Sequence, residues 1–178
     1  MQAESWMEPE TFSGICYHGT CINKNTESVF EELKEEYSEF DAIWVTPDED
    51  VAEIFAKDNR RDVENPVILV FKLKVQLESM AVILDNEYWR DFMSNYECDY
   101  DLRDCIPVLR DMGFDSWYTA GAVDQTFYDD IAIFGYGTKA FISHVKFLGP
   151  SGHWSSYIPI EKAIQEDFFK TTDPVNKR

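Results

Sequence analysis

Short runs of apolar residues separated by polar turns dominate the hydrophobic pattern of this chain. Residues 66–75 predict the clearest strand, because they are apolar on both faces at first and alternate between apolar and polar further on. Residues 42–46 form a second short apolar run, which ends at Pro47. The same reasoning predicts strands at residues 13–20, 81–84, 114–118, 131–134 and 140–148, with a hairpin turn at Gly135 and Gly137 between the last two.

Helical spacing of apolar residues appears in four places. Residues 26–40 predict an amphipathic helix, with apolar side chains on one face and glutamates on the other. A second helix should begin at Thr46-Pro47-Asp48-Glu49, with the threonine as cap and the proline at the first helical position. Residues 86–93 and 104–112 predict two more, the last starting near Pro107 and ending at Gly113.

The order of these elements indicates the fold class. Helices cluster early and strands late, and there is no regular alternation of strand and helix, so we expect an α+β domain. Its 178 residues fit one domain, with the motif-bearing core at about 13–150 and a C-terminal extension at about 151–178.

Charge narrows the range of partners. Asp and Glu number 34 against 16 Lys and Arg, a formal net charge of −18. Direct binding of nucleic acid is disfavoured, because it needs a cationic surface to replace phosphate counterions, and so is docking on an anionic membrane. Hydrophobic residues make up 44% of the chain, which is typical of a folded soluble protein.

Targeting and redox signals are weak. The opening residues have neither the basic nor the apolar region of a signal peptide, and no apolar run is long enough to cross a bilayer. The four cysteines lack the spacing of a zinc site or a thioredoxin-like motif. We therefore expect a cytoplasmic protein with reduced cysteines and no metal.

Three short motifs carry the candidate chemistry. The first, Tyr17-His18-Gly19-Thr20, ends a predicted strand with an imidazole that can donate or accept a hydrogen bond and a glycine that permits close approach of the backbone. The second, Trp44-Val45-Thr46-Pro47, joins a strand to a helix that carries Phe55, eleven residues after Trp44. The third places Asp129 and Asp130 at the start of the strand Ile131-Ala132-Ile133-Phe134, after the segment Gly113-Phe114-Asp115.

In this order the three motifs resemble those of the ADP-ribosyltransferase superfamily, which includes poly-ADP-ribose polymerases and many bacterial and phage transferases. The resemblance runs from about Tyr17 to Lys146 and implies split mixed or antiparallel sheets with flanking helices, and NAD as a substrate. It implies that His18 binds a ribose hydroxyl and that Gly19 and Thr20 help to hold the nicotinamide half. Trp44 and Phe55 would sandwich the nicotinamide ring, with Thr46 beside them.

The same resemblance assigns the catalytic carboxylate to Asp130, assisted by His18. Breaking the bond between nicotinamide and ribose develops positive charge on the sugar, which a nearby anion stabilises. Family members commonly carry glutamate at this position, so the aspartate is one methylene shorter, and Asp124 and then Asp129 are the next candidates. The family's Gln or Glu two residues earlier is Tyr128 here, so the signature for arginine modification is missing.

Two other functions remain open. A transferase-like fold without activity could act by binding, for example as an acidic mimic of nucleic acid that covers a basic partner. NAD glycohydrolysis is the third choice, and 2′-phosphate transfer is disfavoured because only Lys24 lies near the His18 motif.

The distribution of acidic residues favours a basic protein target for the transferase. They are dense at residues 27–58 and 85–130, near the proposed site motifs, and would steer a basic protein surface with a strength that falls as salt rises. By analogy, a chain of this size would suit a bacterial or phage effector.

Overall fold

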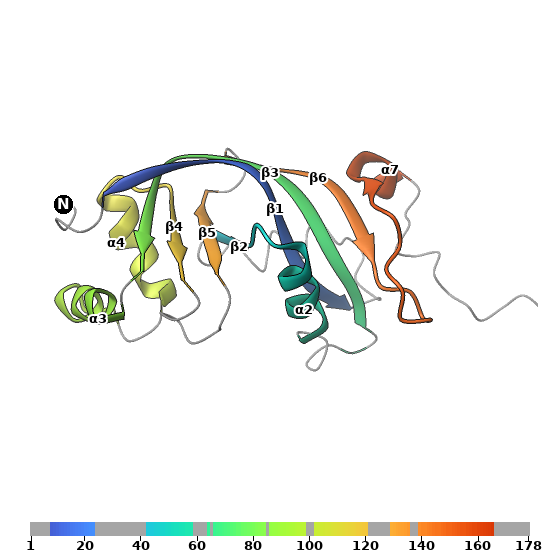
Figure 1. Ribbon diagram of the computed structural model, residues 1–178, viewed down its shortest axis with the longest axis horizontal. Coiled ribbons are helices and arrows are strands. Elements are labelled where there is room, and N and C mark those ends of the chain that lie inside the picture. Colours follow the sequence, from blue (N-terminus) through green and yellow to red (C-terminus); the bar gives the residue numbers. More distant parts are fainter. Residues whose placement is uncertain are drawn as a thin grey trace, which may run out of the picture.

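Two long antiparallel strands form the backbone of the fold in this computed structural model, which describes residues 8–23, 42–58, 64, 66–84, 86–98, 102–120, 129–135 and 139–165. They are β1 (Pro9–Asn23) and β3 (Pro66–Ile83), paired from Pro66 to Ala81 of β3 (Figure 1). In the middle of β3 the alternate residues Leu73, Val75 and Leu77 are buried, as the pattern predicts for a strand with one covered face.

The described strands form one seven-stranded mixed sheet. Its order is β2-β5-β4-β3-β6-β7. Strand β1 pairs with the edge of β3 that faces away from β4 and β6. The bounds are β2 Ala42–Val45, β4 Ser116–Thr119, β5 Asp130–Phe134, β6 Ala140–Phe147 and β7 Ile158–Pro159. Only the pairing of β3 with β4 is parallel.

The strands fall into two groups, β2-β5-β4 and β1-β3-β6-β7, because β3 changes partner along one edge. Residues 69–75 of β3 pair with β6, and residues 80–83 pair with β4. The two groups meet a second time where Tyr17 of β1 bridges Thr46, directly after β2. The sheet therefore curves back on itself at that junction.

Each group has its own helical cover, visible in Figure 1. Helix α2 (Glu49–Asp58) lies on β1 and β3 and buries Ala52 and Ala56 against them. On the other group, α3 (Asn86–Asn95), the 3-10 turn η2 (Leu102–Cys105) and α4 (Ile106–Asp111) share a core with the aromatic side chains of β2, β4 and β5. The last helix of the described residues, α7 (Ile160–Gln165), buries Ala163 in the core shared by the strands.

The α+β class is confirmed, and so are most of the predicted strands and helices. The strands predicted at residues 66–75 and 81–84 are one continuous strand, β3. The hairpin predicted at Gly135 and Gly137 is wrong, because β5 pairs with β2 and β4 while β6 pairs with β3 and β7. The helix predicted at residues 26–40 lies outside the described residues.

Candidate active site at the strand junction

The structure brings the first two motifs into direct contact. The amide of Tyr17 donates to the carbonyl of Thr46 at 2.8 Å, and the amide of Thr46 donates to the carbonyl of Tyr17 at 2.9 Å. Thr46 therefore occupies the strand position beside Tyr17, although the two motifs are separate in the sequence.

The third motif begins close to this contact. The last pair of β2 with β5 is Val45 opposite Ile131, and Thr46 and Asp130 are the residues next to this pair along their own chain segments. Neighbouring strands are about 4.8 Å apart, so Asp130 begins β5 within one or two strand spacings of the contact between Tyr17 and Thr46.

His18 lies inside the fold rather than on an open surface. Its side chain is 8% exposed, and Nδ1 donates to the carbonyl of Trp44 at 2.6 Å. Burial lowers the pKa of His18 to about 4, although the hydrogen bond to Trp44 acts in the opposite direction. The imidazole is therefore neutral at pH 7 and fastens β1 to β2, whereas the predicted contact with a ribose hydroxyl requires that a ligand reach it.

Gly19 and Thr20 are packed into the sheet. A Cβ atom at Gly19 would lie 1.8 Å from the carbonyl oxygen of Ala52, because α2 rests directly on the backbone of β1. Thr20 is 2% exposed. Close packing of α2 accounts for the glycine without any ligand, and the roles predicted for Gly19 and Thr20 in holding nicotinamide stay predictions.

Replacing Gly19 with alanine is expected to lower the free energy of unfolding by about 3 kcal/mol, because the new methyl group meets backbone atoms that cannot rotate away. Gly14→Ala on the same strand is the matched control: its Cβ would lie 3.4 Å from the ring of Phe12, and a change below about 1 kcal/mol is expected. Urea unfolding of both variants measures the difference. Equal losses would show that α2 does not press on Gly19.

The sequence predicted that Thr46 caps α2, and this prediction is wrong. The helix begins at Glu49, and Asp48 is its cap: the amide of Asp50 donates to Asp48 Oδ1 at 3.0 Å, and the amide of Ala52 donates to the Asp48 carbonyl at 3.2 Å. Thr46 Oγ1 accepts from the amide of Asp48 at 3.2 Å. Aspartate is as good a cap as threonine, and its anion suits the positive end of the helix dipole.

The two aromatic residues predicted to sandwich nicotinamide lie on different elements. The ring of Trp44 packs edge-on against Trp117, with centroids 6.4 Å apart, in the core shared with α3 and α4. Phe55 is partly buried on α2, which packs on β1 and β3. The observed neighbour of Trp44 is therefore Trp117, and a sandwich with Phe55 stays a prediction.

The candidate carboxylates have different surroundings. Asp130 is partly buried and begins β5 opposite Thr119. Asp129 is exposed and accepts a hydrogen bond from the hydroxyl of Tyr118 at 2.6 Å; burial and this contact raise the pKa of Tyr118 to about 12. Asp124 and Tyr128 lie outside the described residues. Asp130 is thus the described candidate carboxylate that belongs to β5, the strand paired with β2.

Asp115, in the segment before the third motif, has a structural role. Its Oδ2 accepts from the amides of Glu78 at 2.8 Å and Ser79 at 3.2 Å. These amides lie between the stretch of β3 that pairs with β6 and the stretch that pairs with β4. The carboxylate thereby satisfies backbone groups at the point where β3 changes partner.

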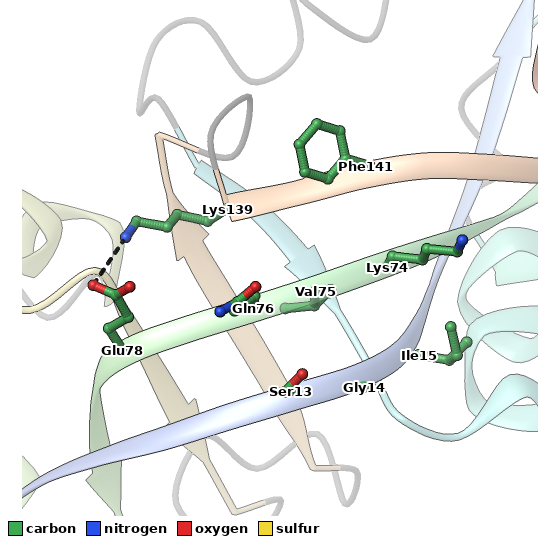
Figure 2. Close-up of a pocket in the computed structure, with 9 residues that line it drawn as sticks. All are labelled: Ser13, Gly14, Ile15, Lys74, Val75, Gln76, Glu78, Lys139 and Phe141. Carbon is green, nitrogen blue, oxygen red and sulfur yellow. Dashed lines mark ion pairs between the residues drawn. The ribbon is translucent and has the colours of Figure 1, made fainter.

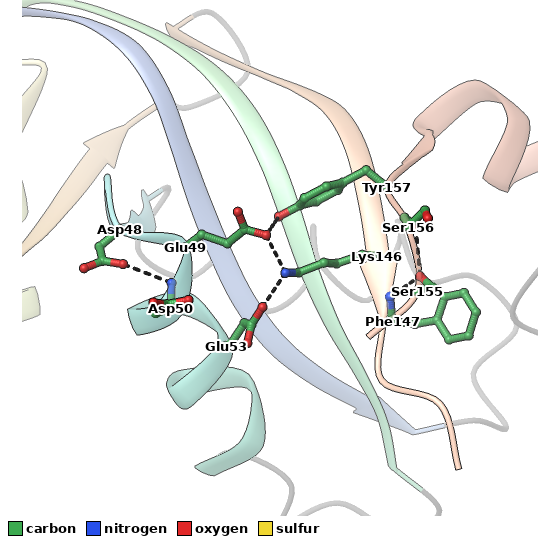
Figure 3. Close-up of polar contacts among 9 residues, drawn as sticks. All are labelled: Asp48, Glu49, Asp50, Glu53, Lys146, Phe147, Ser155, Ser156 and Tyr157. Carbon is green, nitrogen blue, oxygen red and sulfur yellow. Dashed lines mark hydrogen bonds and ion pairs between the residues drawn. The ribbon is translucent and has the colours of Figure 1, made fainter. Parts of the chain in front are cut away.

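A buried lysine cluster next to the junction was not found from the sequence. Lys146 of β6 is 5% exposed and forms ion pairs with Glu49 and Glu53 of α2, while the hydroxyl of Tyr157 donates to Glu49 at 2.9 Å (Figure 3). Lys146 Nζ also lies 5.0 Å from the ring centroid of Trp154. The spacing of Glu49 and Glu53 on one helix face was the only available signal, and it does not name their partner.

The ion pairs set the protonation states in this cluster. Burial alone would lower the pKa of Lys146, but the hydrogen bonds to Glu49 and Glu53 outweigh it and the pKa is raised. Burial alone would raise the pKa of Glu49, but the hydrogen bonds from Lys146 and Tyr157 outweigh it and the pKa is lowered. Both groups are therefore charged over a wide range of pH, and the cluster fastens α2 to β6.

Within the described residues, no group of three or more His, Cys, Asp or Glu side chains is arranged to hold a metal ion. None of the described helices combines the length and the apolar character that a membrane crossing requires. Comparison of the chain with protein-family models, with curated proteins and with solved structures found no match.

Proposed function

We propose that this chain is an NAD-dependent ADP-ribosyltransferase that modifies a protein target. The observation that carries the proposal is the contact of Tyr17 with Thr46 beside β5, the strand that Asp130 begins, so that three motifs from distant parts of the sequence lie near one junction of strands. The division of the sheet into two strand groups that meet at this junction also agrees with the split sheets that the resemblance implies.

The chemistry assigned to the site needs one anion. When the bond between nicotinamide and ribose C1′ breaks, nicotinamide leaves with the electron pair and positive charge develops on the sugar. The Asp130 carboxylate stabilises this charge, and a nucleophile of the target protein then bonds to C1′ and loses its proton. Trp44 and Phe55 are proposed to contact the nicotinamide ring, and His18, Gly19, Thr20 and Thr46 to shape the pocket that receives it.

Asp130→Asn is expected to reduce transfer of label from NAD to protein at least about a hundredfold while leaving the fold intact, because the amide keeps the size of the side chain and removes its charge. The assay incubates the protein with labelled NAD and a cell lysate and follows labelled bands. Asp111→Asn, at an exposed carboxylate of α4, is the control, and full activity in Asp130→Asn with loss in Asp129→Asn would move the role to Asp129. Full activity in Asp130→Asn together with loss in Asp124→Asn would move the role to Asp124.

The same assay tests the alternatives. Release of nicotinamide without labelled protein would identify an NAD glycohydrolase. Absence of both signals, with no rise in melting temperature on adding NAD, would contradict an enzyme and favour an inactive binding protein. The burial of His18 favours the inactive binding protein, because a ligand cannot easily reach a buried imidazole. The net charge of −18 would direct such a protein to a basic partner.

A further inference from the structure

A groove of about 460 Å³ runs along the face of β1, β3 and β6 (Figure 2). Its lining includes Ser13 and Ile15 of β1, Lys74 and Gln76 of β3, and Phe141 of β6. This volume lies within the range of sites for small molecules, about 300–1,000 Å³. The lining mixes apolar, cationic and hydrogen-bonding side chains.

The centre of the groove is one row of cross-strand neighbours. Ile15 pairs with Lys74, and Lys74 pairs with Phe141, so the three side chains stand next to each other on the same face. Phe141 is 64% exposed and Ile15 is 40% exposed. The exposed ring of Phe141 offers a surface on which a planar ring of a ligand can stack. The ammonium group of Lys74 beside it offers a positive charge to an anion.

The groove is less acidic than the chain as a whole. Two lysines, Lys74 and Lys139, line it against a single carboxylate, Glu78, whereas the whole chain carries −18. Lys139 lies 3.8 Å from Glu78 and 3.7 Å from Asp115, so its charge is partly balanced. Lys74 is exposed and forms no ion pair within the described part of the chain. Lys74 is therefore a cation of the groove that no described carboxylate pairs with, on a protein that is acidic overall.

The net charge of the chain favours a small anion over a nucleic-acid polymer as the ligand of this groove. A nucleic-acid polymer extends well beyond the groove and would be repelled by a chain with a net charge of −18. A small anion is held by the local lysines, because at physiological salt charges more than about 8 Å away are largely screened. The ring and the charge that the groove offers match a planar base and a phosphate group.

We propose that this groove binds a nucleoside phosphate, with the base against Phe141 and the phosphate at Lys74. Gln76 and Ser13 supply amide and hydroxyl groups that can bond to the sugar and base. The groove adjoins the strand junction, since Ile15 is two residues from Tyr17 on the same face of β1, about 7 Å along the strand. The nucleotide is either the ADP half of NAD or a separate molecule.

Titration of the whole protein with ADP, followed by calorimetry, tests the proposal. Lys74→Glu and Phe141→Ala are each expected to weaken ADP binding about tenfold, by loss of the phosphate contact or of the stacking surface. Both positions are exposed, so both variants should fold. Adenosine and inorganic pyrophosphate, which lack one half of the ligand each, should bind more weakly than ADP.

Arg90→Glu is the matched control, because it changes the net charge by the same amount at an exposed position of α3, on the other strand group (Figure 1). It should change ADP binding less than about twofold. No ADP binding to the folded wild type, or an equal loss in Arg90→Glu and Lys74→Glu, would overturn the proposal.

Competition with NAD separates the two sources of the nucleotide. Displacement of ADP by NAD, lost in Lys74→Glu, shows that the groove takes the ADP half of NAD; ADP binding that NAD does not displace shows a separate nucleotide, and either result supports the groove. The outcome can be told apart from that of the transferase proposal, because ADP binding to the folded wild type is measured without any transfer reaction: ADP binding without transfer contradicts only the transferase, and transfer without ADP binding contradicts only the groove.

Discussion

Replacing Lys146 with methionine is expected to lower the free energy of unfolding at pH 7 by about 3 kcal/mol, because two carboxylates lose their shared cation. The value is at the lower end for a broken buried pair, since the side chain of Glu49 is 36% exposed and water can hydrate part of its charge. The loss should shrink at acid pH, because the Glu49 carboxylate, whose pKa is lowered by the hydrogen bond from Lys146, then takes up a proton and no longer needs the cation. Guanidinium unfolding at pH 7 and at pH 4 measures both effects.

Two further variants make this prediction specific. Lys74→Met removes a lysine that is exposed and without an ion pair in the described region, and it should change stability by less than about 0.5 kcal/mol. The triple variant Lys146→Met, Glu49→Gln, Glu53→Gln removes all three charges and should recover most of the loss. Equal losses in Lys146→Met and Lys74→Met, or no recovery in the triple variant, would contradict a charge-paired cluster.

Local patterns predicted the elements whose formation depends on local sequence. The apolar run at residues 66–75 marked β3. Gly113 follows α4 with φ of +93°, a conformation that glycine adopts without strain and other residues rarely adopt. The continuation of β3 to Ile83 was not predictable, because the polar Glu78 and Ser79 interrupt the apolar pattern. Their amides are held by the side chain of Asp115, a contact made across 36 or more residues of sequence.

At the candidate site, too, local motifs could be found from the sequence, whereas contacts between distant segments could not. The order of the motifs predicted that residues near His18, Thr46 and Asp130 would meet. Tyr17 does bridge Thr46, and Asp130 begins the strand that pairs with β2, whereas a shared site stays a prediction. The surroundings of each residue were beyond the sequence. No local signal shows that α2 will rest on Gly19, or that Glu49 will pair with Lys146 at a separation of 97 residues. Packing between distant elements decides these contacts.

Acid is expected to destabilise the protein through His18 between about pH 6.5 and pH 4. The pKa of His18 is lowered by burial from 6.5 in the unfolded chain to about 4 in the fold. Over this interval the unfolded state binds a proton that the folded state does not, so stability is full above pH 6.5 and falls as the pH falls. A difference of about 2.5 pKa units corresponds to about 3 kcal/mol at the acid end.

His18→Asn isolates this contribution, because the asparagine amide can still donate to the carbonyl of Trp44 but has no proton to gain. Carboxylates also titrate in this range, so the quantity to measure is the free energy of unfolding of the wild type minus that of the variant at each pH. This difference should fall by about 3 kcal/mol from pH 7 to pH 4. A constant difference for His18→Asn would mean that the imidazole is reachable by water and free to meet a ligand, as a ribose-binding role requires.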